Sequence, residues 1–80
     1  MTKAIKVEAS KDFTIIVSLE DGRKFKLDLS YIKNSSGPVV EPLKNQNEFI
    51  KAFIQDGIVS WSTGFDIDPY FILEEGTPLK

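Results

Sequence analysis

The carboxylates near the C-terminal end of this chain are the side chains with the most evident capacity for chemistry. Asp66 and Asp68 precede Pro69, and Glu74 and Glu75 follow a few residues later. Carboxylate oxygens bind calcium or magnesium, and paired carboxylates carry out acid–base catalysis. The spacing, however, lacks the glycine-centred loop of an EF-hand. A helix cap explains Asp68 more simply because a proline follows it, so we expect no metal site and no cofactor.

The chain contains no histidine and no cysteine. Without histidine it lacks the usual general base and the commonest transition-metal ligand. Without cysteine it has no thiolate nucleophile, disulfide or cysteine-rich zinc site. A carboxylate-only enzyme would need a deep pocket around its acidic pair. We therefore predict a protein that is not an enzyme and has no catalytic residues.

Length and charge narrow the function classes further. Eighty residues allow one domain, which we place at residues 1–80. The net charge is −2, without the basic excess that phosphate binding usually requires, so direct nucleic-acid binding is not expected. No apolar run approaches the roughly 20 residues of a membrane span, and the N-terminus lacks the apolar core of a signal peptide. These features predict a cytoplasmic protein without membrane contact.

The stretch WSTGFDIDP, residues 61–69, contains the only tryptophan of the chain. A core position under the predicted helix is the simpler interpretation of Trp61. The residue also lies where a strand ends and a turn begins, and such loops often carry binding contacts. As candidate partner-binding residues we therefore name Trp61, Gly64, Asp66 and Tyr70. Of these four residues, Asp66 has the least evident structural role.

A second candidate surface is a small basic patch formed by Lys6, Lys24 and Lys26 around Ile16. These residues share the outer face of the sheet predicted below. Such a face is usually solvated, and strand lysines also discourage edge-to-edge aggregation. A contact surface for an acidic partner is the functional alternative.

The first 30 residues alternate between apolar and polar side chains, which predicts three strands. A three-residue loop at residues 20–22 would place Val17 opposite Phe25, whereas a two-residue loop would place apolar side chains opposite lysines. A similar loop at residues 10–12 would place Val7 opposite Ile15. The apolar positions are Ile5, Val7, Ala9, Phe13, Ile15, Val17, Leu19, Phe25, Leu27 and Leu29.

The apolar face of this meander must be shielded from water by another element. Residues 45–57 predict a helix that packs on it. Asn45 and Glu48 resemble a capping box, and Gly57 would stop the helix. The helical stripe would contain Phe49, Ile50, Phe53 and Ile54. Residues 58–61 suggest a short strand, and a helical turn would run from Asp68 to Gly76. The predicted class is α+β: an antiparallel three-stranded meander plus a further short strand, covered by one main helix and a short C-terminal helical turn.

The ordered set of these signals resembles a bacterial family, domain of unknown function 2442. The resemblance covers roughly residues 3–73, and an isoleucine at 72 stands where leucine is usual. It implies a small α+β fold with no recorded catalytic residues. Some members are fused to a helix-turn-helix domain, and others are similar to one half of a toxin–antitoxin-like gene pair. The matching residues are Asp21, Gly22, Asp28, Leu29, Pro42, Leu43, Phe49, Gly57, Trp61, Gly64, Asp66, Pro69 and Ile72.

We therefore expect a non-catalytic regulatory module that binds another small protein, as one half of such a pair. The alternative is a nucleic-acid-associated transcriptional regulator, acting through the basic patch or through a partner. A homodimer is also open, because small domains with an exposed sheet edge often dimerise.

Overall fold

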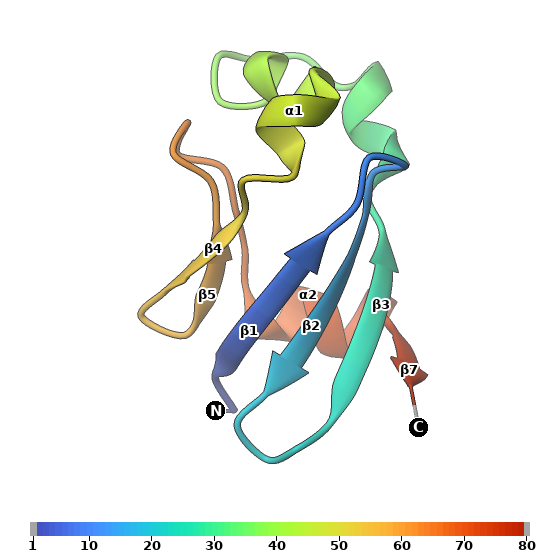
Figure 1. Ribbon diagram of the computed structural model, residues 1–80, viewed down its shortest axis with the longest axis vertical. Helices are drawn as coiled ribbons and strands as arrows, with labels where there is room; N and C mark the ends of the chain where they lie inside the picture. Colours follow the sequence, from blue (N-terminus) through green and yellow to red (C-terminus); the bar gives the residue numbers. More distant parts are fainter. Residues whose placement is uncertain (1, 80) are drawn as a thin grey trace.

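Two antiparallel sheets and a short C-terminal helix surround the core of this protein (Figure 1). The computed structural model describes residues 2–79. One sheet has the order β1–β2–β3–β7, and the other has the order β4–β5–β6. The elements are β1 Ala4–Ala9, β2 Thr14–Leu19, β3 Lys24–Asp28, β4 Phe53–Gln55, β5 Ile58–Ser60, β6 Asp66–Ile67 and β7 Thr77–Leu79, the 3-10 helices η1 Ser30–Asn34 and η2 Glu41–Lys44, and the helices α1 Gln46–Phe49 and α2 Pro69–Glu75.

The predicted pairing of β2 with β3 is confirmed. Val17 lies opposite Phe25, and the loop closes where the Leu19 amide donates to the Arg23 carbonyl at 2.8 Å. Gly22 supplies the left-handed residue of the loop, with φ +94°. The Asp21 carboxylate accepts a hydrogen bond from the Arg23 amide at 3.1 Å, which fixes the turn.

The predicted register between β1 and β2 is wrong by two residues. Val7 lies opposite Val17, and the loop comprises residues 11–13 rather than residues 10–12. Phe13 takes a left-handed conformation with φ +66° inside this loop. Its ring is buried, 4.9 Å from that of Phe49, so core packing offsets the strain of that conformation. The Asp12 carboxylate also holds the turn by accepting from the hydroxyl of Thr14 at 2.7 Å.

The start of β1 departs from simple alternation as well. Ala4 lies opposite Leu19, but Lys6 lies opposite Ser18, so Ile5 forms a bulge between them. Ile5 is consequently 61% exposed, and Ala4 is buried in its place. The expectation that Ile5 faces the core is therefore wrong.

The predicted helix over residues 45–57 is also wrong beyond its first turn. α1 begins as expected, because the Asn45 side chain caps it by accepting from the Asn47 amide at 2.8 Å. After Phe49 the helix ends and the chain becomes β4. Asp56 and Gly57 have φ angles of +53° and +81°, which suit a two-residue hairpin turn. Gly57 is thus a hairpin residue, and a second sheet replaces the expected main helix.

The C-terminal elements agree better with expectation. A strand does form at Ile58–Ser60, and the Asp68 side chain caps α2 by accepting from the Phe71 amide at 3.1 Å. α2 ends before Gly76, as predicted. The strand that follows, β7, was not predicted; it pairs with β3 and widens the meander to four strands.

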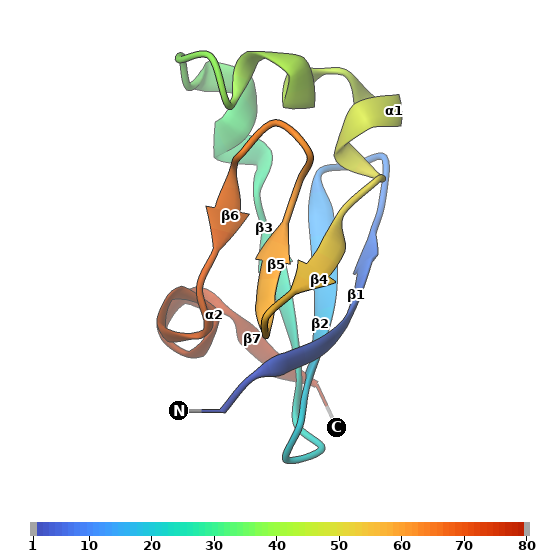
Figure 2. The same cartoon turned by 90° about the vertical axis from the view of Figure 1, so that its left-hand side faces the viewer.

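The core lies between the two sheets and α2. Figure 2 shows β4, β5 and β6 in front of β2 and β3, with α1 and both 3-10 helices gathered at one end. Within residues 2–79, no helix is long and apolar enough to cross a membrane. The core residues are Ala4, Phe13, Ile15, Val17, Leu19, Phe25, Leu27, Leu29, Ile32, Val40, Leu43, Phe49, Val59, Trp61, Ile67 and Ile72.

Candidate functional site

Trp61 is a core residue that links the two halves of the fold. Its side chain is only 3% exposed, and its Nε1–H donates to the carbonyl oxygen of Phe49 at 2.7 Å. Its ring lies 5.5 Å from that of Phe49 and 5.4 Å from that of Phe65. Of the four candidate partner-binding residues, Trp61 is therefore the one whose side chain lies inside the protein.

Gly64 belongs to the three-residue loop between β5 and β6. Trp61 and Phe65 close this loop through a 2.9 Å backbone hydrogen bond, and Gly64 has φ +102°. The hydroxyl of Thr63 donates to the carbonyl of Val39 at 2.7 Å and ties the loop to the preceding segment. Gly64 is exposed, but the left-handed turn already accounts for its identity.

Asp66 lies on the outer face of the second sheet. Strand pairing places it beside Ser60, which in turn lies beside Phe53, whereas the next residue, Ile67, faces the core. Within the described residues, no hydrogen bond or ion pair engages the Asp66 carboxylate. Alternation along the chain directs Asp68 to the same outer side. Two carboxylates therefore share this face.

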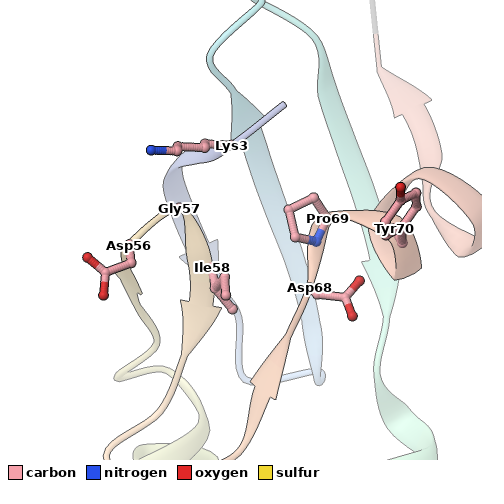
Figure 3. A pocket seen from close by; sticks show the side chains of 7 residues that line it. All are labelled: Lys3, Asp56, Gly57, Ile58, Asp68, Pro69 and Tyr70. Atoms are coloured by element: carbon pink, nitrogen blue, oxygen red, sulfur yellow. The ribbon is translucent and has the colours of Figure 1, made fainter. Parts of the chain in front are cut away.

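A cleft of about 270 Å³ opens where the β4–β5 turn meets the start of α2 (Figure 3). Ile58 and Pro69 lie in its middle, and Tyr70 lies at one end. The Tyr70 side chain is 62% exposed. The lining residues are Lys3, Asp56, Gly57, Ile58, Asp68, Pro69 and Tyr70. The cleft thus brings together Tyr70, one of the predicted partner-binding residues, and Asp68.

Backbone contacts hold one wall of this cleft in place. The Ala4 amide donates to the Gly57 carbonyl at 2.9 Å, which attaches the β4–β5 turn to the start of β1. The aliphatic part of Lys3 lies directly over Gly57, because a Cβ added there would come within 2.8 Å of the Lys3 Cβ. Only glycine fits this close approach and the positive φ together. The sequence signal for this wall was the Asp56–Gly57 pair, a strong hairpin signal.

The surface around the cleft is acidic and partly apolar. Residues 52–79 include five aspartates and glutamates but no lysine or arginine, and Lys3 is the one basic residue among those that line the cleft. Tyr70 and Leu73, three residues apart on α2, are both exposed. Among the described residues, no three His, Cys, Asp or Glu side chains form a group that could hold a metal ion.

The three lysines of the predicted basic patch do share one sheet face. Lys6 lies beside Ser18 and Ser18 beside Lys24, while Lys26 lies in the neighbouring row. This face points toward the viewer in Figure 1, away from α2. Lys6 forms an ion pair with Glu8 at 3.1 Å, which offsets one of its charges.

Two carboxylates, those of Asp12 and Asp28, lie near enough to Lys26 to feel its charge. Hydrogen bonding to Thr14 lowers the pKa of Asp12, and the charge of Lys26 lowers it slightly further. A hydrogen bond from the Ser30 amide lowers the pKa of Asp28, with a smaller contribution from Lys26. The face is therefore mixed in charge rather than uniformly basic.

Comparison with known proteins identifies one family. The model of the family described as "Protein of unknown function (DUF2442)" matches residues 4–78, almost the whole chain. Searches of curated proteins and of solved structures found no match.

Proposed function

Because the chain belongs to the DUF2442 family of proteins of unknown function, we propose its function from its surface. It is a non-catalytic module of the bacterial cytoplasm that binds another small protein, as the regulatory half of a two-gene pair. The observation that carries this proposal is the exposed ring of Tyr70 beside the cleft. Exposed aromatic side chains next to a concave surface are typical anchors of protein interfaces.

The dimensions of the cleft favour binding over catalysis. Its volume of about 270 Å³ lies just below the range of roughly 300–1,000 Å³ typical of small-molecule sites. An opening of this size suits one or two side chains of a partner better than a whole substrate. Its two carboxylates, Asp56 and Asp68, point away from each other in Figure 3, whereas an acid–base pair would converge on one reacting group.

The proposal is tested by co-expressing the tagged chain with the product of each adjacent gene. Complexes are detected by size-exclusion chromatography with light scattering. We expect one stoichiometric complex, weakened at least several-fold by Tyr70→Ala. Tyr31→Ala is the matched control, because Tyr31 is also exposed but lies on η1, at the other end of the molecule from α2 (Figure 1). If both variants bound the partner equally well, the cleft would not be part of the interface.

A nucleic-acid-associated regulator remains the second candidate. The observation in its favour is the placement of Lys6, Lys24 and Lys26 on one open sheet face. The nearby carboxylates offset much of that charge, so this candidate ranks lower. A gel shift in low salt with generic duplex DNA tests it, with a triple lysine-to-glutamine variant as the control. No shift of the unaltered protein at high concentration would end it.

A further inference from the structure

We propose that the partner segment bound in the cleft carries an arginine and an apolar side chain on the same side of its backbone. The arginine stacks on the ring of Tyr70 and pairs with Asp68, while the apolar side chain packs on Ile58, beside the buried Pro69. This inference rests on the proposed function and adds the chemistry of the partner.

The apolar half of the proposal follows from the middle of the cleft. Figure 3 places the side chains of Ile58 and Pro69 between the two ends of the cleft. The ammonium end of Lys3 and the carboxylate of Asp56 both point away from Pro69 in this view. Pro69 is buried and Ile58 is half-buried, so the carbon surface that the middle offers belongs mainly to Ile58. An apolar side chain would be removed from water there, which is the main favourable term in such contacts.

The cationic half follows from the Tyr70 end. The Asp68 Oδ1 atom accepts the helix-capping hydrogen bond from Phe71, and no hydrogen bond engages Oδ2 within residues 2–79. Asp66, the neighbouring carboxylate on the same side, also lacks a partner among these residues. Residues 52–79 hold no lysine or arginine, and Lys3, the one basic residue that lines the cleft, lies at the opposite end with its ammonium group pointing away from Pro69 (Figure 3).

The chemistry at this end favours arginine over lysine. A guanidinium is planar, so it stacks on an exposed tyrosine ring and still donates hydrogen bonds to a carboxylate at its edge. An ammonium group is more strongly hydrated and cannot form both contacts in that geometry. A spacing of two residues places both partner side chains on one side of an extended backbone.

The probes are blocked peptides in which leucine and arginine are separated by one serine, in both orders, flanked by serines. Binding to the ¹⁵N-labelled chain is followed by NMR chemical-shift titration. We expect shifts at the amides of Gly57, Ile58 and Tyr70. Replacing the arginine by lysine should weaken binding about two- to fivefold, and glutamate in its place should abolish it. Replacing the leucine by serine should weaken it by about tenfold.

Variants of the chain locate the contacts. Tyr70→Ala and Asp68→Asn should each lower the affinity for the arginine peptide by about two- to fivefold. Asn remains a good helix cap, so Asp68→Asn removes the charge without removing the capping acceptor. Glu20→Gln, which neutralises an exposed carboxylate in the β2–β3 loop, and Tyr31→Ala are the matched controls; both residues lie outside the cleft lining, and the variants should change the affinity little. The proposal is overturned if the glutamate peptide binds as well as the arginine peptide, or if the shifts fall on the face of Lys24 instead.

The two proposals fail differently. If a neighbouring gene product forms a complex that is unaffected by Asp68→Asn and Tyr70→Ala, the proposed function stands and this inference is wrong. If the arginine peptides bind as predicted but no adjacent gene product does, the chemistry of the cleft stands and the two-gene proposal is wrong.

Discussion

Replacing Trp61 by phenylalanine should destabilise the protein strongly although the substitution keeps an aromatic ring. The indole Nε1–H donates to the carbonyl oxygen of Phe49, and no other hydrogen bond to that oxygen is found within the described residues. Phenylalanine has no donor, so a buried carbonyl would lose its partner. The smaller ring would also leave a void beside the rings of Phe49 and Phe65.

The magnitude follows from these two losses. An unpaired buried carbonyl costs about 1–3 kcal/mol, and the atoms missing from the smaller ring cost about 1 kcal/mol more. The sum, about 2–4 kcal/mol, is a large part of the stability of an 80-residue domain. At about 4–8 °C per kcal/mol, the unfolding midpoint should fall by about 10–30 °C.

Thermal unfolding followed by far-ultraviolet circular dichroism is the suitable assay, because the variant lacks the tryptophan needed for fluorescence. Tyr31→Phe, which also removes a polar group from an aromatic side chain but at an exposed position, is the control and should leave the midpoint within about 2 °C. A loss below about 0.5 kcal/mol in Trp61→Phe would refute the reasoning, since the hydrogen bond would then contribute nothing to stability.

Three further predictions concern backbone, charge and capping. Gly57→Ala should lower the free energy of unfolding in urea by about 2–4 kcal/mol. Gly22 has a similar positive φ but open space around it, so Gly22→Ala should lower it by only about 1 kcal/mol. The difference between the two losses measures the contact with Lys3. A hydrogen bond from a backbone amide holds the pKa of Asp28 below its usual 3.8. The contribution of the Asp28 carboxylate to stability is therefore complete above that value and is lost as the pH falls through the folded pKa. Asp28→Asn should reduce the drop in the urea midpoint between pH 5 and pH 2.5. Asp68→Ala should cost about 1 kcal/mol through the lost helix cap while Asp68→Asn costs little, and equal losses in thermal unfolding would contradict the capping role.

The sequence predicted best those elements whose signals were local and had one interpretation. Alternation and the glycine turn defined the β2–β3 hairpin, because the alternative two-residue loop would have placed apolar side chains opposite lysines. The Asp68–Pro69 pair and Gly76 likewise marked both ends of α2. Trp61 was expected first in the core, where it lies.

The failures arose where two signals competed or where a tertiary contact decided. The apolar spacing of Phe49, Ile50, Phe53 and Ile54 fits a helix, but Asp56–Gly57 in the same segment is a hairpin signal. The chain forms the β4–β5 hairpin there, and the helix ends at Phe49. The β1–β2 loop moved because Phe13 fills a space beside Phe49 that only the folded chain creates. The cleft was not predicted, because its walls come from three separate segments, residue 3 and residues 56–58 and 68–70, that only the folded chain brings together.

The central position of Trp61 has a consequence for how unfolding can be observed. Its ring joins the end of β5 to α1 and, through Phe49, to Phe13 in the turn of the first sheet. As the only indole in the chain, it makes the tryptophan emission a single-site reporter placed where both sheets meet. If the sheets separate in one cooperative step, emission and circular dichroism will trace the same transition. If the second sheet opens first, the emission will change while most of the strand signal persists, and the domain will prove to contain two units of unequal stability.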